Sequence, residues 1–286
     1  MVGIRNCKTR SAPVRSLAMM VGTTFANYTV VQRLNHGGMA DVYLVTDSQD
    51  RRFALRVLLP ELRFHWRERR RFRWGCAVNR HFDHPNIVHI FDDGKFRGLR
   101  YCVIEYVAGP NLKECILRAD PQLRPQRQKL LTGLAAGLAH IHDRGYLHLD
   151  FKPENVLTTL TYDPKIIDFD LAIPRPDRPK KAAKLSGTPI YLAPEQILRQ
   201  PVDERADIFA FGLTAYEMMT GKKPITGNTL DEVISKYANF DQHLKPPRTH
   251  APDIMPGLER VILKCLAKDV TRRYPSMGLV LRDLQS

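Results

Sequence analysis

Residues able to do acid–base and ionic chemistry gather in two short runs of the sequence. The run 148–157 reads HLDFKPENVL, and the run 168–170 reads DFD. The carboxylates of Asp150 and Asp168 can take up a proton or bind a cation, and the amide oxygen of Asn155 suits the same hard cations. A lysine two residues after Asp150 can neutralise a nearby anion. A base, a cation-binding pair and a positive charge are what transfer of a phosphoryl group requires.

Two further runs lie downstream. Residues 187–195 read GTPIYLAPE, and residues 207–212 read DIFAFG. In this order and spacing the four runs are specific, and over residues 28–286 the chain resembles the eukaryotic-type (Hanks-type) Ser/Thr protein kinases, most closely their bacterial branch. The resemblance implies the α+β class and a bilobal protein-kinase fold, with a small β-rich N-lobe and a larger α-helical C-lobe. It also implies phosphoryl transfer from ATP to Ser or Thr of a protein substrate, with Mg²⁺ (or Mn²⁺) as cofactor.

The resemblance assigns catalytic roles to five residues. Asp150 would orient and deprotonate the substrate hydroxyl. Lys152, which marks Ser/Thr rather than Tyr specificity in the family, would stabilise the transferring phosphate. Asn155 and Asp168 would hold Mg²⁺. Thr188 would brace Asp150 and help form the loop that faces the substrate.

The resemblance also outlines an adenine pocket and three structural positions. Apolar side chains from both lobes would sandwich the base, and the backbone of residues 105–107 would act as the hinge that hydrogen-bonds to it. The residues expected at the nucleotide are Leu34, Gly37, Val42, Ala54, Arg56, Ile104 (the gatekeeper), Glu105, Val107, Asn111 (a ribose contact) and Leu157. The expected structural residues are Glu195, its partner Arg273, and Asp207, which would hold the catalytic loop.

The phosphate-handling positions of the N-lobe depart from the family pattern. Family members carry L-G-x-G-x-x-G-x-V, whereas residues 34–42 read LNHGGMADV and keep the middle glycine, Gly37. Arg56 replaces the lysine of the third strand and is bulkier and planar. Gly75 stands where the helix partner of that lysine is normally Glu, and Glu68 lies roughly 10 Å away along a helix. The usual ion pair is therefore not expected.

A further N-lobe departure is Asn79, which replaces an apolar residue and would weaken the stack of Ile90, Phe169 and His148. Two departures in the C-lobe are expected to be milder. Leu149 replaces an arginine that normally pairs with a phosphorylated loop, which makes such switching less expected. Asp170 replaces a glycine and would add negative charge near the metals, recruiting Mg²⁺ or repelling phosphate.

Three interpretations of function stay open. The first is a Ser/Thr protein kinase of atypical or weak activity, favoured because the base, the lysine, the metal ligands and the adenine walls are all present. The second is a pseudokinase that serves as a nucleotide-binding or docking scaffold, because Asn35, Ala40, Arg56 and Gly75 loosen the grip on the phosphates. The third is a small-molecule phosphotransferase, which the run 187–195 disfavours because it would build a groove for a polypeptide.

Hydrophobic patterning predicts the elements that must position these residues. Strands are predicted at 28–31, 42–45, 53–58, 87–91 and 100–107, with turns at Gly37-Gly38 and 92–94. Helices are predicted at 61–82, 126–142, 207–220 and 257–268, and a mobile loop at 174–187. The expected domains are a basic N-terminal extension over 1–27, a kinase-like N-lobe over 28–107 and a kinase-like C-lobe over 108–286.

Composition indicates a globular protein in a reducing compartment. The 286 residues are 43% hydrophobic and 26% charged, and no apolar run is long enough to cross a membrane. The five cysteines are scattered and form no CxxC pair, so a disulfide framework or a zinc site is not expected. These features predict a cytoplasmic location and no transmembrane segment.

Positive charge is concentrated in one segment. The net charge is +14, and residues 51–80 hold ten arginines against two glutamates. This segment predicts either a docking face for an acidic protein, nucleic acid or anionic lipid, or a solvated helix face whose aromatic residues form a buried stripe. The solvated face is favoured. The expected partner is a protein substrate or an acidic docking partner, with no specific nucleic acid and no prediction of oligomeric state.

Overall fold

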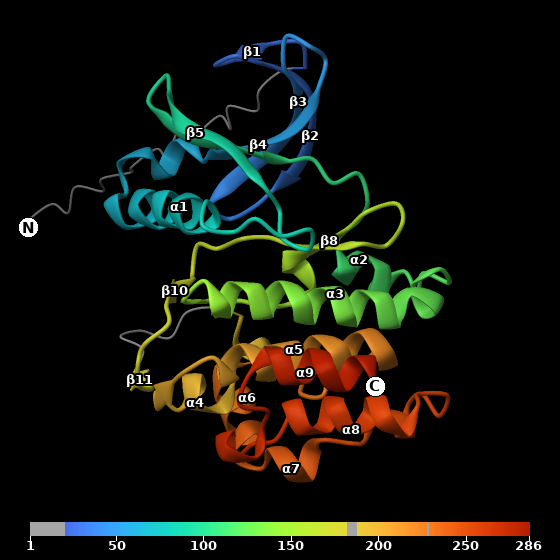
Figure 1. Cartoon of the computed structure of the whole chain (residues 1–286). Helices are drawn as coiled ribbons and strands as arrows, with labels where there is room; N and C mark the ends of the chain where they lie inside the picture. Colours follow the sequence, from blue (N-terminus) through green and yellow to red (C-terminus); the bar gives the residue numbers. More distant parts are fainter. Residues whose placement is uncertain (1–20, 182–187, 228) are drawn as a thin grey trace, which may run out of the picture.

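The computed structural model describes residues 21–181, 188–227 and 229–286, which form two lobes (Figure 1). Within these ranges the N-lobe contains a six-stranded antiparallel sheet in the order β1-β2-β3-β4-β6-β5. Helix α1 packs on the sheet through a small apolar cluster that includes Phe72, Cys76 and Ile90. The N-lobe elements are β1 (Thr24–Phe25), β2 (Tyr28–His36), β3 (Ala40–Thr46), β4 (Arg52–Leu58), α1 (Trp66–Asn79), β5 (Ile90–Phe96) and β6 (Leu99–Glu105).

The turn between β5 and β6 corrects a prediction. The chain reverses at Arg97 and Gly98, which have φ values of +47° and +84°, and residues 92–94 lie inside β5. A two-residue hairpin loop needs positive φ at its centre, and Gly98 supplies it without steric cost. The composition of residues 92–94 resembles a turn, but Gly94 instead makes room for an aromatic ring of β6. The predicted turn at Gly37-Gly38, between β2 and β3, is confirmed.

The sheet begins before Tyr28. Residues 24 and 25, expected in the N-terminal extension, form β1 and pair with β2. The side chain of Phe25 is buried, and its ring lies 4.9 Å from that of Phe96 and 5.6 Å from that of Tyr101. These edge-to-face contacts fix the strand to the far side of the lobe. Residues 1–20 of the expected extension lie outside the described residues.

The arginine-rich segment is only partly amphipathic. Of its aromatic residues, Phe72 is 1% exposed, whereas Phe64 is 78% and Trp66 is 63% exposed. Trp74 is 38% exposed, so the predicted buried aromatic stripe is wrong for Phe64, Trp66 and Trp74 and holds for Phe72. A turn of 3₁₀ helix at Pro60–Phe64 precedes α1 and ends at an extended residue, which breaks the helical periodicity on which the stripe depended.

The C-lobe is built from helices and short strand pairs. The predicted helices at 126–142 and 207–220 lie within α3 and α5, and the one predicted at 257–268 ends at Cys265. Of the predicted loop at 174–187, residues 182–187 lie outside the described residues. The helices are α2 (Leu112–Leu117), α3 (Leu123–Asp143), α4 (Pro194–Ile197), α5 (Arg205–Thr220), α6 (Leu230–Ala238), α7 (Phe240–His243), α8 (Pro256–Cys265) and α9 (Met277–Gln285). The strands are β7 (Tyr146–Leu147), β8 (Val156–Thr158), β9 (Pro164–Ile166), β10 (Ile173–Pro174), β11 (Lys180–Lys181) and β12 (Pro201–Val202).

Helix α5 lies at the centre of this lobe. Every residue from Ala206 to Met219 is buried, which is the pattern of a helix surrounded by protein on all sides. The helix ends at Gly221, whose φ of +68° is the left-handed conformation that commonly closes helices. Helix α5 contacts α3 and α8, and α3 in turn packs on α9 (Figure 1). None of the helices in the described ranges is long and apolar enough to cross a membrane.

A buried ion pair joins Glu195 of α4 to Arg273, which lies between α8 and α9. Arg273 donates to the Glu195 carboxylate through Nη1 at 2.7 Å and Nη2 at 2.8 Å, and the Arg273 side chain is fully buried. The same guanidinium also donates to the backbone carbonyls of Ala267 and Arg205. The sequence-based pairing of Glu195 with Arg273 is thus present in the structure.

We expect Glu195→Ala to lower the free energy of unfolding by about 3–5 kcal/mol, because it leaves a buried charge unpaired. Arg282→Ala is the matched control: it removes an exposed arginine that pairs with Asp283, and its cost is expected to be below about 1 kcal/mol. Urea denaturation of both variants measures the difference. Equal costs in the two variants would contradict this account of the buried pair.

Candidate active site

The catalytic loop is held in place by one buried carboxylate on α5. Asp207 accepts hydrogen bonds from the backbone N–H groups of His148 and Leu149, both at 2.8 Å, and from the His142 ring at 2.9 Å. Burial raises the pKa of Asp207, but these hydrogen bonds more than offset it and hold the pKa below its usual range. Leu149 has a φ of +57°, a strained conformation for a branched side chain. The contacts of Asp207 therefore match its expected role, which is to hold the loop that bears Asp150.

The candidate base lies in a small polar network. Lys152 Nζ lies 3.0 Å from Asp150 Oδ2 and donates to Thr188 Oγ1 at 2.9 Å. Asn155 Nδ2 donates to the backbone carbonyl of Asp150 at 2.8 Å and to its carboxylate at 3.0 Å. Four of the five expected catalytic residues are thus linked in one network of hydrogen bonds. Thr188 reaches Asp150 through Lys152, not by a direct bond.

The fifth expected residue, Asp168, lies beside this network. The N–H of Ile167 donates to the backbone carbonyl of Asn155 at 3.0 Å, which places the two candidate metal ligands next to each other. Asp168 has a φ of +67°, and its side chain is 34% exposed. Burial acts to raise its pKa, but the charge of Arg56, together with smaller contributions from His148 and from hydrogen bonds with Asp170, outweighs this, so the pKa is lowered and the carboxylate is charged at neutral pH.

These two residues fit a magnesium ion. Because Asn155 uses its Nδ2 toward Asp150, its amide oxygen is the atom left to bind a cation, and it makes no hydrogen bond in the described residues. No group of three His, Cys, Asp or Glu side chains within the described ranges is arranged around a metal. A metal here would therefore take one carboxylate and one amide, with the remaining ligands from phosphate and water. Mg²⁺ is commonly bound in this way.

The expected adenine walls come from adjacent strands. Ala54 in β4 pairs with Ile104 in β6, and Val42 in β3 pairs with Arg56 in β4. From the C-lobe, Leu157 in β8 forms a bridge with Asn111. Apart from Ala54, which is buried, all of these residues are half-buried, as residues that line a cleft should be.

The expected hinge leaves backbone groups available. The N–H of Glu105 donates to His89 at 2.8 Å, and its carboxylate pairs with Lys165 at 2.7 Å. Val107 is 9% exposed, and in the described residues its N–H and carbonyl make no hydrogen bond. Unpaired backbone groups beside an apolar wall are suited to the edge of an adenine ring. The side chain of Asn111, expected at the ribose, caps α2 by accepting from Glu114 N at 2.9 Å.

Polar contacts hold the hairpin that corresponds to the glycine-rich loop. The N–H of Gly37 donates to the Ala40 carbonyl at 3.0 Å. Asp41 is buried and accepts from Arg33 at 2.6 Å, with the His36 ring also at 2.6 Å. Leu34 is 38% exposed. The hairpin therefore forms with one of the three family glycines in place. The contacts of Arg33 and His36 with Asp41 hold the backbone where the family pattern relies on the flexibility of glycine.

Arg56 is paired in a way that the sequence did not predict. Its Nη1 donates to Asp170 Oδ1 at 3.0 Å and its Nη2 to Asp170 Oδ2 at 2.5 Å, while Nη2 also lies 3.6 Å from Asp168 Oδ1. The Asp170 side chain is 1% exposed. The Asp170 carboxylate is therefore buried and paired with Arg56, so it is not a free ligand that could recruit Mg²⁺ as expected. Its effect on phosphate stays a prediction.

Burial governs the electrostatics of this pair. Burial, aided by Asp168, raises the pKa of Asp170 to about 6, although Arg56 opposes the rise. Burial likewise opposes the charge on Arg56, but the two carboxylates raise its pKa well above the usual value. Burial thus disfavours the charge on each partner, and the opposite charge of the other partner counteracts it.

Two more contacts were missed by sequence reasoning. Trp74 Nε1 donates to the Ala172 carbonyl at 2.6 Å, which fastens α1 to the segment after Asp170. Phe82 packs on Phe169 at 5.0 Å, beside the contact of Phe169 with His148 at 5.2 Å. No sequence signal marks Trp74 or Phe82. The pairing of Asp170 did have a signal, because relative to the family pattern the glycine and the acidic residue have changed places.

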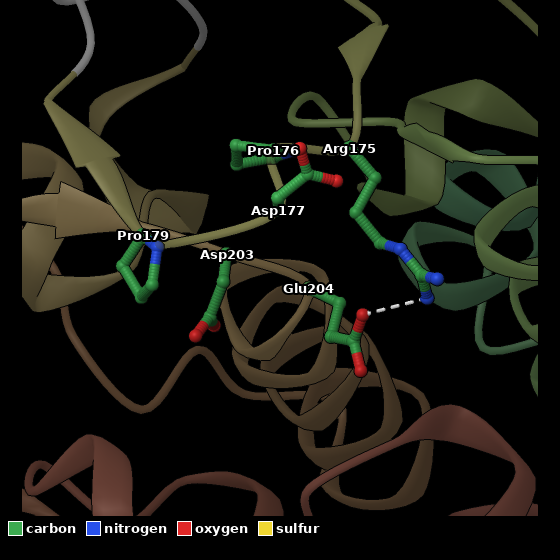
Figure 2. Close-up of a pocket in the computed structure, with 6 residues that line it drawn as sticks. All are labelled: Arg175, Pro176, Asp177, Pro179, Asp203 and Glu204. Carbon is green, nitrogen blue, oxygen red and sulfur yellow. Dashed lines mark hydrogen bonds and ion pairs between the residues drawn. The ribbon is translucent and has the colours of Figure 1, made fainter.

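A shallow pocket lies away from these residues. It has a volume of about 410 Å³ and lies between the segment after β10 and the start of α5, where Arg175 pairs with Glu204 at 2.9 Å (Figure 2). It contains none of the expected nucleotide or metal residues. The candidate site is therefore the group of residues around Asp150, Asp168 and Arg56, and not this pocket.

The comparisons with known proteins agree with this geometry. A family model of the protein kinase domain matches residues 28–283. The chain therefore belongs to the protein kinase family. It is 33% identical over 270 residues to the serine/threonine-protein kinase PknB of Mycolicibacterium smegmatis and 30% identical over 271 residues to PrkC of Bacillus subtilis. These alignments cover 90% and 94% of this chain but 42% of each relative, so the chain spans less than half the length of these relatives.

Solved structures show the same fold. Two structures of the kinase domain of Mycobacterium tuberculosis PknI align with TM-scores of 0.69 and 0.68, at 29% and 27% identity. The alignments cover 94% of this chain and 99% and 98% of those domains. The predicted bilobal α+β kinase fold and the resemblance to bacterial Hanks-type kinases are confirmed.

Asp207→Asn should destabilise the protein by about 1–3 kcal/mol, because an amide cannot accept all three hydrogen bonds. The folded-state pKa of Asp207 is lowered, so its stabilising effect is present above its unfolded-state pKa and is lost as the pH falls. The difference in unfolding free energy between wild type and variant should therefore be largest above about pH 5 and shrink below about pH 4. Urea denaturation across this range measures it.

Asp231→Asn, on an exposed position of α6, is the control and should show no such difference. A pH-independent gap between wild type and Asp207→Asn would contradict the prediction.

Proposed function

We propose that this chain is an ATP- and Mg²⁺-dependent protein kinase that transfers the γ-phosphoryl group to a Ser or Thr hydroxyl. The observation that carries the proposal is the network of Asp150, Lys152, Asn155 and Thr188 beside Asp168. Membership of the protein kinase family, which generally uses ATP and Mg²⁺, supports it. So does the similarity to relatives whose names identify them as serine/threonine kinases.

Each residue of the network has a step that its contacts suit. The Asp150 carboxylate would accept the proton of the substrate hydroxyl. Lys152, held between Asp150 and Thr188, would keep a positive charge where the phosphoryl group passes. Asp168 and Asn155 would hold Mg²⁺, which when bound neutralises phosphate charge. Because the side chains already contact one another, little reorganisation would be needed for the transfer.

The nucleotide would lie between the lobes. Ala54 and Val42 from above and Leu157 from below would enclose the adenine, and the free backbone groups of Val107 would hydrogen-bond to its edge. Arg56 would face the phosphates from β4. The division of the chain into an N-lobe over 28–107 and a C-lobe over 108–286 is part of this proposal.

The interpretation as a pseudokinase rested on the replacement of N-lobe residues that normally bind the nucleotide phosphates. Arg56 keeps its charge in the cleft and has a carboxylate partner, and the hairpin at Gly37 is formed. These contacts favour retained catalysis over a scaffold that does not transfer phosphate. A protein with accessible Ser or Thr is the substrate class that follows.

We expect Asp150→Asn to lower phosphoryl transfer by at least about 100-fold, because the amide cannot take up the hydroxyl proton. The measurement is transfer from γ-labelled ATP to a generic basic protein, with Mg²⁺ and with Mn²⁺. Asp231→Asn is the matched control and should keep the wild-type rate. Equal transfer by wild type and Asp150→Asn would exclude the kinase.

Nucleotide binding should depend on metal through Asp168. We expect ATP with Mg²⁺ to raise the Tm of the wild type more than ATP alone, because the ion offsets repulsion between phosphate and the Asp168 carboxylate. Asp168→Asn should remove most of this Mg²⁺-dependent difference, and thermal-shift titration measures it. A Tm that does not respond to ATP in the presence or absence of Mg²⁺ would count against nucleotide binding altogether.

A further inference from the structure

We propose that Asp170 positions Arg56 for the phosphates of the nucleotide, and that Gly75 is the space that admits its carboxylate. This inference rests on the proposed function. In the family pattern the cation of the third strand is paired by a glutamate on the helix of the N-lobe. Here the partner comes from the segment that follows Asp168, and the helix contributes a glycine instead of a charge.

The geometry of the pair is that of two parallel hydrogen bonds. The two Nη atoms of Arg56 each meet one oxygen of Asp170, at 3.0 and 2.5 Å. A planar guanidinium can make this bidentate contact, whereas a lysine ammonium can donate only from a single point. The Arg56 group also lies over the Phe72 ring at 5.1 Å, which restricts its plane. The arginine at this position is therefore suited to an aspartate whose two carboxylate oxygens both face the guanidinium.

The cation remains directed at the site. Arg56 Nη2 is 3.6 Å from Asp168 Oδ1, so the guanidinium lies between the candidate metal ligand and Asp170. The Arg56 side chain is 17% exposed and that of Asp170 is 1% exposed, so the arginine is the partner that a ligand could reach. Asp170 thus fixes the position of the Arg56 guanidinium, and Arg56 supplies the positive charge for the phosphates.

Gly75 is required by the position of Asp170. A Cβ built at Gly75 would lie 2.1 Å from Asp170 Oδ1 and 3.1 Å from both the Cα and N atoms of Asp170. No side chain fits at that distance, and the obstacle includes backbone that cannot rotate away. Any larger residue at position 75 must displace either the carboxylate or the helix.

Helix α1 is fixed at the same place by a second contact. Trp74, the neighbour of Gly75, donates to the Ala172 carbonyl at 2.6 Å. The helix and the segment 170–172 therefore meet over a close, specific surface. Glu68, the nearest acidic residue of α1, forms no ion pair within the described part of the chain. Arg56 is consequently coupled to the segment that carries Asp168 and not to a carboxylate on the helix.

The test exchanges the two residues. Gly75→Glu alone displaces Asp170, and Asp170→Gly alone removes the partner of Arg56, so each should lower kcat by about tenfold or more and raise the KM for ATP. The double variant Gly75→Glu with Asp170→Gly returns a carboxylate from the helix into the vacated space. Its kcat should be clearly higher than that of either single variant, whereas independent effects would multiply to a loss of about 100-fold; this non-additivity marks direct coupling.

Gly257→Ala is the matched control, since the nearest atom to an added Cβ there is 3.9 Å away, and it should leave kcat and KM unchanged. All rates are measured well below the Tm of every variant, so that the folded protein is compared. A double variant no better than the poorer single variant would overturn the proposal. So would single variants that lose thermal stability but keep the wild-type kcat and KM, because the pair would then be structural only.

Failure of the proposed function is separable from failure of this inference. If wild type and Asp150→Asn transfer phosphate equally, the proposed kinase activity is wrong, and the dissociation constant for ATP becomes the readout. The single variants should then bind ATP about tenfold more weakly, and the double variant should regain affinity. Equal dissociation constants in all four proteins would overturn the role of Asp170.

Discussion

The ion pair between Arg56 and Asp170 is the interaction on which the arrangement of the cleft depends. Both partners are largely buried, and removal of either would leave a charge whose desolvation costs several kcal/mol. The pair joins β4 of the N-lobe to the segment that carries Asp168. It also dictates a glycine at position 75 of α1, since a Cβ there would overlap the carboxylate. Three residues that each break the family pattern are thus parts of one contact, and none of them can be understood separately.

The two lobes differ in how closely their contacts follow the family pattern. In the C-lobe, Asp207 projects from a helix buried on all sides and holds the catalytic loop by three hydrogen bonds. Its contacts follow the family pattern, so the loop that bears Asp150 is positioned as the resemblance implied. In the N-lobe the pattern is rebuilt. The buried carboxylate of Asp41 organises the hairpin where glycines are missing, and Asp170 replaces a glutamate of the helix. In the N-lobe, charged and polar side-chain contacts therefore replace the conformational freedom of the missing glycines.

The arginine-rich segment has a divided role. Phe72 and Cys76 of α1 pack against the sheet, while Phe64 and Trp66, just before and at its start, face solvent. Arg63 lies over the Phe64 ring at 4.6 Å and Arg67 over the Trp66 ring at 5.4 Å, so these aromatic faces are partly covered by cations. The part of α1 that matters to the cleft is its inner face, around Gly75.

The sequence by itself indicated the family, the fold class, the order of the lobes and the residues of the candidate catalytic network. These features follow from local runs whose spacing is fixed along the chain, such as 148–157, and from apolar periodicity, which located α3 and α5. Only the tertiary structure decided the partner of Arg56, because Asp170 is 114 positions away and the exchange of glycine and acidic residue does not by itself say which side chains meet. The same reason applies to the contact of Trp74 with Ala172. The turn at Arg97 and Gly98 was decided by strand pairing, which overrode the turn-like composition of residues 92–94.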